Sequence, residues 1–319
     1  MKYIFLTSIF LLALSQKILG QDLKEIEIAD SLSTIGDFKK ANTLYKQLLT
    51  KQQKNEEWRG SIEVTIKLVN NYYNQRRVND ALLLLNNTID FYAENLTFTD
   101  SLIAILFHKK GIGLTLKKDF KSSIPFYQRA IKIRKGITKK NYPDIIKCLN
   151  NIGICYYELS EPDSATLYLE QALKLQPKAP YSSISDTYTI LSRLNRDLGN
   201  FTKAEDYYLA NLSVSRVLKK ADWEIANEYL DFSHFYIDSE QYEKTVKITQ
   251  MAIFYYERID QKYPEDYEGI ANSYNNQGFA YRKLEDYNLA LGKLNLALEF
   301  GKLGWLNQKK DAFADVLLI

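Results

Sequence analysis

Apolar residues recur along most of the chain at three- and four-residue spacing, in stretches separated by short breaks. This spacing is the period of an amphipathic helix, whereas a half-buried strand would alternate every second residue. Over residues 148–177, one periodic stretch ends at a break near 160–162 and a second periodic stretch follows. Each such pair of stretches predicts two antiparallel helices joined by a short turn.

Within these pairs, a small or short side chain on the first helix is followed nineteen residues later by an anchor on the second helix. Seven such pairs occur in series: Ala29/Leu48, Val69/Thr88, Gly111/Ala130, Gly153/Ala172, Ser192/Asn211, Ser233/Ala252 and Gly278/Ala297. Small residues at these positions suit two helices that approach to about 8–10 Å. The repeat length of about 41 residues predicts a solenoid of stacked helical hairpins.

The second helices share a further pattern of a large residue, a small residue and another large residue. Clear examples are Phe38/Ala41/Tyr45, Phe201/Ala204/Tyr208 and Tyr287/Ala290/Leu294. From about Leu23 to the C-terminus the chain resembles the tetratricopeptide repeat, and its longer units resemble the roughly 42-residue subclass of kinesin light chains and bacterial exported signalling proteins. The resemblance implies an all-α, right-handed solenoid of about seven repeats and a partial eighth. It also places most tyrosines in the core.

The C-terminal segment is expected to begin that eighth repeat. The domain boundaries that we predict are a signal peptide over 1–20, the repeat domain over 21–300 and the start of an eighth repeat over 301–319. From Trp305 onward, an apolar stripe of Phe313, Val316 and Leu317 has no second helix on which to pack. We expect a truncated eighth unit of a longer protein; the alternative is that this end docks on a partner or on a second copy.

The N-terminus predicts export. Lys2 precedes an apolar run from Tyr3 to Leu14, and a small residue follows at Gly20, as in a secretory signal peptide. As a helix, this run would span about 18 Å, short of the roughly 30 Å of a bilayer core, so an uncleaved anchor is the less favoured alternative. Cleavage is expected after Gly20, with Ser15 as the second choice. The mature chain would then be periplasmic or secreted, without a later membrane span.

Composition narrows the partners and the chemistry. The 319 residues include 42 basic and 39 acidic side chains, for a net charge of +3, so nucleic acid is not an expected partner. Cys148 and Cys155 lie seven residues apart on one predicted helix, about 10.5 Å, whereas a disulfide needs about 4.4 to 6.8 Å between Cα atoms. We expect both cysteines to be buried as small apolar residues.

The sequence does not predict an enzyme. Its two histidines, His108 and His234, fall in different units, and the common nucleotide-binding, hydrolase and metalloprotease motifs do not occur. We therefore expect no catalytic residues, no cofactor and no metal.

Binding is the favoured function, because the first helices of stacked hairpins line a continuous concave surface in repeats of this kind. The repeat register predicts a partner-binding groove made of Tyr73, Asn74, His108, Lys147, Asn150, Tyr157, Arg193, Arg196, His234, Asn275, Phe279 and Arg282. Asparagine and aromatic side chains suit a protein or peptide partner. Arg193 and Arg196, one helical turn apart, are the pair best placed to hold an acidic side chain.

Two further hypotheses concern the role of this groove. Because aromatic side chains beside Asn and Asp also suit sugar rings, the alternative to protein binding is an exported carbohydrate- or nutrient-binding module. The resemblance also implies that the chain is the sensor part of a larger bacterial signalling protein. Self-association through the C-terminal helix is a further expectation.

Overall fold

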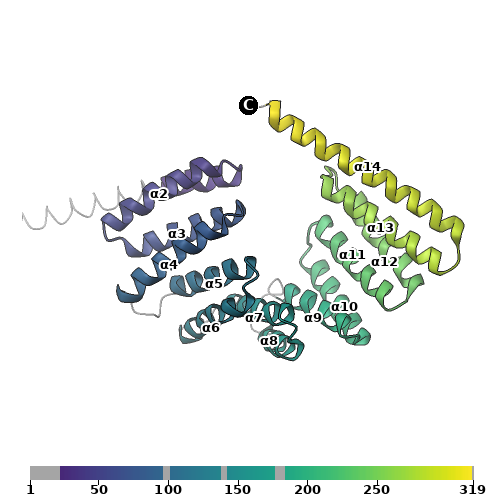
Figure 1. The fold of residues 1–319 in the computed structure, drawn as a ribbon, viewed down its shortest axis with the longest axis horizontal. Coiled ribbons are helices and arrows are strands. Elements are labelled where there is room, and N and C mark those ends of the chain that lie inside the picture. Colours follow the sequence, from purple (N-terminus) through teal and green to yellow (C-terminus); the bar gives the residue numbers. More distant parts are fainter. Residues whose placement is uncertain (1–21, 96–100, 138–141, 177–183, 318–319) are drawn as a thin grey trace, which may run out of the picture. The chain divides into compact units, whose positions relative to one another are not determined.

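The computed structural model describes residues 22–95, 101–137, 142–176 and 184–317 (Figure 1). Side chains are described for these ranges except 93–95 and 308–317. The predicted signal peptide and the stripe of Phe313, Val316 and Leu317 therefore fall outside the described residues or side chains. Helices and short connections make up the described ranges, as the sequence predicted.

The helices form antiparallel hairpins in chain order. A first helix over residues 22–34 is followed by α2 (Phe38–Lys54), α3 (Trp58–Asn74), α4 (Val78–Asn95), α5 (Ser101–Leu116), α6 (Phe120–Gly136), α7 (Tyr142–Glu158), α8 (Pro162–Leu175), α9 (Ser185–Asp197), α10 (Phe201–Val217), α11 (Asp222–Asp238), α12 (Tyr242–Glu257), α13 (Pro264–Lys283) and α14 (Tyr287–Leu317). Within the described ranges, each of the seven predicted units is one hairpin. The all-α fold of stacked hairpins is confirmed.

The chain divides into two compact units, Met1–Ala172 and Leu173–Ile319. The first contains the described helices up to most of α8, and the second contains α9 to α14. The packing is described below within each unit. None of the helices in the described ranges is long and apolar enough to cross a bilayer.

The small position of the first helix is a direct contact with the second helix. A Cβ atom added at Gly153 would lie 2.7 Å from Leu169 Cγ, and one added at Gly278 would lie 2.7 Å from Leu294 Cγ. At Gly111 the same atom would lie 2.6 Å from the Tyr127 ring. Because such distances are too short for real atoms, these glycines let the two helices approach each other closely. The small positions predicted from the nineteen-residue spacing therefore have a physical cause.

Aromatic residues fill the space around this contact. Tyr45, Tyr127 and Tyr208 hold the same position on their second helices and are all buried. In the second unit, Tyr208 stacks on Phe232 with ring centroids 4.7 Å apart, and both belong to a core cluster that reaches from α10 to α13. Offset aromatic pairs stabilise a core beyond the area that they bury. These tyrosines are core residues, as the repeat pattern predicted.

The turn inside each hairpin has a common backbone conformation. One residue of each turn has a positive φ: Gly36, Arg76, Lys118, Ser160, Gly199, Glu240 and Glu285. After α5, the Asp119 N–H donates to the Leu114 carbonyl at 2.9 Å, which closes a Schellman motif around Lys118. The sequence predicted where these turns lie but not their conformation, because glycine occupies the left-handed position in only two of the seven.

The C-terminal helix differs from the sequence expectation. A new first helix was expected near Trp305, but α14 continues without a break from Tyr287 to Leu317. Gly304 packs against the start of α13, where an added Cβ would lie 3.2 Å from both the Pro264 carbonyl oxygen and Tyr267 Cβ. This glycine allows a close helix contact, and the chain does not turn at it.

The shared turn conformation leads to a stability prediction. Lys118 is exposed and has φ 61°, a conformation that costs an L-residue about 1–2 kcal/mol. Because glycine adopts it without strain but loses more backbone entropy, we expect Lys118→Gly to raise the free energy of unfolding by about 0.5–1 kcal/mol in urea titrations. Lys132→Gly, at an exposed position in the interior of α6, is the matched control and should lower it by about 1 kcal/mol. Equal destabilisation by both changes would contradict this account.

Candidate partner-binding surface

The first helices of successive hairpins contact one another. In the first unit α3 contacts α5 and α5 contacts α7, and in the second unit α11 contacts α13. Stacking of this kind aligns the outward sides of the first helices into an extended surface. We call it the first-helix face and describe it separately for α3, α5 and α7 and for α9, α11 and α13.

His108 connects two helices of the first unit. Its Nε2 lies 3.0 Å from Asn151 Nδ2 of α7, and its ring centroid lies 5.7 Å from that of Tyr127. Burial, together with the positive charges of Arg134, Lys109 and Lys147, lowers the pKa of His108 to about 3. The imidazole is therefore neutral near pH 7 and accepts a hydrogen bond from Asn151. This geometry indicates a structural role for a residue that the sequence placed in the groove.

Two other predicted groove residues, Tyr73 and Asn150, are engaged or buried within the chain. The Tyr73 hydroxyl donates to the Lys109 carbonyl at 2.6 Å and packs against Gly113, which ties α3 to α5. Asn150 is only 3% exposed, so a partner could not reach it without a rearrangement of α7. Tyr157 is half-buried on the same helix. The register placed these residues on the correct helices but could not show which side chains neighbouring helices cover.

The open part of the first unit's face is positively charged. Asn74 and Lys147 are exposed, and Lys109 is half-buried on α5. Burial lowers the pKa of the Lys109 ammonium, and the positive charge of Lys147 lowers it further, so the two cations act on each other electrostatically. Among the described side chains, neither forms an ion pair with a carboxylate. Lys109 was not among the predicted groove residues, because its interaction with Lys147 depends on how α5 and α7 align.

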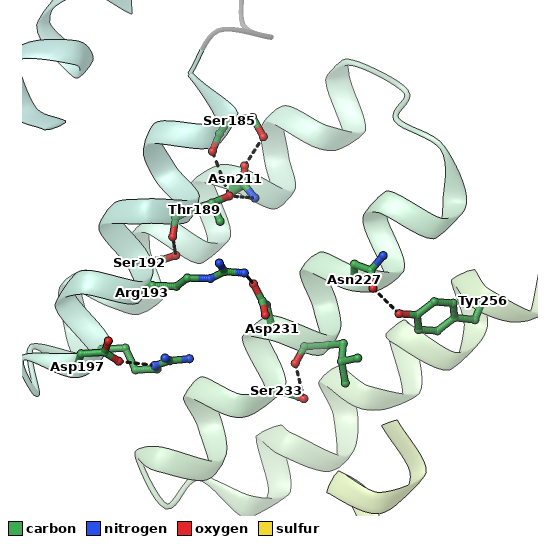
Figure 2. A network of polar contacts seen from close by, with 12 residues as sticks. Ser185, Thr189, Ser192, Arg193, Asp197, Asn211, Asn227, Asp231, Ser233 and Tyr256 are labelled. Atoms are coloured by element: carbon green, nitrogen blue, oxygen red, sulfur yellow. Dashed lines mark hydrogen bonds and ion pairs between the residues drawn. The ribbon is translucent and has the colours of Figure 1, made fainter. Parts of the chain in front are cut away.

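In the second unit the predicted arginine pair is already engaged. Arg193 of α9 forms an ion pair with Asp231 of α11 (Figure 2). Arg196 Nε lies 3.0 Å from Asp197 Oδ1 and 3.5 Å from Asp238 Oδ2. These pairs join α9 to α11, so an acidic partner would have to compete with acids of the chain itself. A role for this pair in partner binding stays a prediction.

Hydrogen bonds between polar side chains also join neighbouring helices of the second unit. Ser185 donates to Asn211 Oδ1 at 2.7 Å, and Asn211 Nδ2 donates to Thr189 Oγ1 at 3.2 Å, which connects α9 to α10 (Figure 2). The Tyr256 hydroxyl of α12 donates to Asn227 Oδ1 of α11 at 2.7 Å. Because buried polar groups are costly unless satisfied, such networks fix one relative placement of the helices.

The remaining predicted residues lie on α11 and α13. His234 of α11 is exposed. Desolvation lowers the pKa of its imidazole, and the negative charge of Asp231 partly opposes this lowering. Asn275 and Arg282 are exposed. Phe279 is half-buried, with the Arg282 guanidinium 5.2 Å and the Lys283 ammonium 5.7 Å from its ring centroid. This part of the face combines amide, cationic and aromatic groups.

The cysteines are structural, as predicted. Both are free and fully buried, and burial raises the pKa of the Cys148 thiol to about 12. Arg134 Nη1 donates to Cys148 Sγ at 2.8 Å. A thiol with so high a pKa is a poor nucleophile. Within the described residues, no group of three or more His, Cys, Asp or Glu side chains is placed to hold a metal ion.

One protein-family profile matches part of the chain. Residues 102–178, which span the hairpins α5/α6 and α7/α8, match the sequence profile of the tetratricopeptide repeat family. The same hairpin recurs through the described part of the chain. The predicted resemblance to tetratricopeptide repeat proteins is confirmed, and proteins with this fold generally act as protein-interaction scaffolds. None of the curated proteins compared with the chain matches it significantly.

Solved structures with the same fold extend over most of the chain. A signal transduction ATPase with numerous domains and a tetratricopeptide repeat sensor, from Pyrococcus horikoshii, is 18% identical with a TM-score of 0.69 over 92% of this chain and 45% of that chain. The apo form of RapI is 15% identical, with a TM-score of 0.61 over 88% and 98%. A putative kinesin light chain from Podosopora anserina is 16% identical, with a TM-score of 0.53 over 62% and 95%. At these identities the likeness shows the fold alone.

The buried His108 predicts an acid-dependent loss of stability. The pKa of His108 in the folded chain lies below the ordinary value near 6.5. Above pH 6.5 the imidazole is neutral in both the folded and the unfolded chain, so it does not lower the free energy of unfolding there. Below about 6.5 the unfolded chain takes up the proton first, and the free energy of unfolding falls by up to about 1.4 kcal/mol per pH unit until the folded-state pKa is reached.

The His108→Gln variant checks this prediction. Because glutamine does not titrate in this range, its free energy of unfolding should fall less steeply than that of the parent between pH 6.5 and 5. Urea titrations at several pH values measure the difference. Parallel curves for parent and variant would contradict the proposed burial of a neutral imidazole.

Proposed function

We propose that this chain is a non-enzymatic scaffold that binds an extended, acidic segment of a partner protein along the first-helix face of its first unit. The observation that carries the proposal is the pair of cations Lys109 and Lys147, which lack ion pairs with the described carboxylates. In the second unit, by contrast, Arg193 and Arg196 are neutralised by acids of the chain. Charge complementarity therefore favours an acidic segment on the first unit.

The size of this face suits a short extended segment. Neighbouring helices pack about 8–10 Å apart, so the three first helices α3, α5 and α7 extend over about 16–20 Å. An extended chain covers that distance with about five or six residues. Asn74 at the end of α3 is exposed on this face, and its amide can pair with a peptide backbone.

The contacts of two aromatic side chains, one on the first-helix face of each unit, favour protein binding over carbohydrate binding. The alternative depends on aromatic faces that are free to stack on sugar rings. However, Tyr73 is held by the Lys109 carbonyl, and Phe279 is covered by the Arg282 and Lys283 cations. These contacts reduce the aromatic area that a sugar could use.

We further propose that the chain is exported and acts as a sensor part of a larger signalling protein. The apolar run from Tyr3 to Leu14 supports export, and the short length of that run supports cleavage. The Pyrococcus protein, which is named as having a tetratricopeptide repeat sensor, supports the sensor role by analogy of fold.

Peptide display tests the binding proposal. Peptides enriched on the parent chain should be rich in Asp and Glu, and Lys147→Glu should weaken their binding at least about tenfold, because a cation is replaced by a like charge. Lys132→Glu, at an exposed position on the second helix α6, is the matched control and should leave binding within about twofold. Enrichment of the same acidic peptides on the parent and on Lys147→Glu would contradict the proposal.

The export proposal has a separate test. Expression in a bacterial host with a secretion pathway, followed by fractionation and N-terminal sequencing, should yield an exported chain that starts at Gln21. Substitution of Leu11 and Leu12 by Asp should retain the uncleaved chain in the cytoplasm by breaking the apolar run. An exported chain that still begins at Met1 would support the uncleaved anchor instead.

A further inference from the structure

The hairpin α13/α14 has an open apolar groove whose equivalent is covered in earlier hairpins. When the hairpins are aligned on their small positions, Leu291 and Leu298 of α14 correspond to Ile124 and Ile131 of α6. Those isoleucines are 7% and 8% exposed, because α7 packs over them, whereas Leu291 is 61% and Leu298 is 63% exposed. Ile253 of α12, also equivalent to Leu298, is 3% exposed beneath α13. The same position is therefore buried where a further helix follows.

This groove is a definite cavity between two helices. Ala271, Asn272 and Asn275 of α13 form one side, and Leu294, Leu298 and Trp305 of α14 form the other, around a volume of about 680 Å³. Trp305 is itself 54% exposed. Large apolar side chains gathered at one open groove are typical of an interaction site.

The earlier hairpins also indicate what fits such a groove. The groove of α5/α6 is occupied by α7, and that of α11/α12 by α13. Each occupant is an amphipathic helix that runs antiparallel to the second helix of the hairpin it covers. The occupant of the last groove should therefore be an amphipathic helix antiparallel to α14.

α14 itself has the pattern that meets this requirement. Its apolar stripe consists of Tyr287, Leu291, Leu294, Leu298, Gly301 and Trp305, with spacings of 4, 3, 4, 3 and 4 residues. This pattern reads the same in both directions about residue 296, and the 3-4 spacing is that of a coiled-coil seam. The stripe extends over about 27 Å of helix, long enough for a helix pair.

Reversal of the stripe brings complementary residues together. Trp305 would face Tyr287 of the other helix, Leu294 would face Leu298, and Leu291 would face Gly301, so a large side chain meets a small one. At the flanking positions, Lys302 would face Asn288, and like charges do not meet. A two-fold contact needs this kind of self-complementarity, because residue i contacts j on one copy and j contacts i on the other.

We propose that the occupant is a second copy of this chain, and that two copies pair through antiparallel α14 helices about a two-fold axis near residue 296. In this arrangement each α14 lies in the α13/α14 groove of the other copy. The proposal does not depend on the first-helix face of the first unit, where the acidic segment is proposed to bind, so either proposal can fail alone.

The oligomeric state of the full chain tests the pairing. Sedimentation equilibrium should give a dimer for the parent, and Leu291→Glu/Leu298→Glu should weaken the dimer at least about a hundredfold, because four buried leucines become charged. Leu209→Glu on α10, at a leucine that is 49% exposed, is the matched control and should leave the dimer unchanged. Helical circular dichroism verifies that each variant is folded. A monomeric parent, or a dimer that persists in the double variant, would overturn the proposal.

Cross-linking tests the antiparallel geometry. A chain with Asn288→Cys mixed with a chain with Lys302→Cys should form a covalent dimer with a short bis-maleimide reagent, at least about fivefold more than either chain alone. The natural Cys148 and Cys155 are fully buried and should not compete. Equal cross-linking in each chain alone would indicate a parallel or non-specific contact and would also overturn the proposal.

Discussion

Close contact between the two helices of each hairpin is the constraint on which the rest of this structure depends. At Gly111, Gly153 and Gly278 the missing side chain makes room for a large residue of the second helix, sixteen positions later. This contact fixes the distance between the helices, and the left-handed residue of each turn fixes their direction. Repetition of one such unit stacks the hairpins, so a local packing rule becomes an extended surface.

The two units use that surface in different ways. In the second unit, ion pairs such as Arg193–Asp231 and hydrogen bonds such as Ser185–Asn211 join neighbouring helices, and the Arg193 and Arg196 charges are compensated by acids of the chain. In the first unit, His108 and Tyr73 join the helices through neutral contacts, and the Lys109 and Lys147 charges stay available. Because exposed and partly desolvated cations attract acids, this difference in how the helices are joined is the basis of the acidic partner that we propose for the first unit.

Sequence alone predicted the hairpins, their small positions and the buried cysteines, because these features follow from periodicity within about thirty residues. It could not predict contacts that depend on how separate hairpins align. Asn150 was expected in the groove, yet it is buried, and Lys109 was not among the predicted groove residues although its charge interacts with that of Lys147. A new repeat was expected to begin over 301–319, but Gly304 packs on α13 and α14 continues through it. Glycine allows both a turn and a close helix contact, and only the packing decides between them.

Hydrogen–deuterium exchange with a bound acidic peptide tests the central claim, that the first-helix face of the first unit is the binding surface. The account predicts slower exchange in α3, α5 and α7 on peptide binding, with α4 and α6 unchanged. Protection confined to α4 and α6, or to the second unit alone, would contradict it.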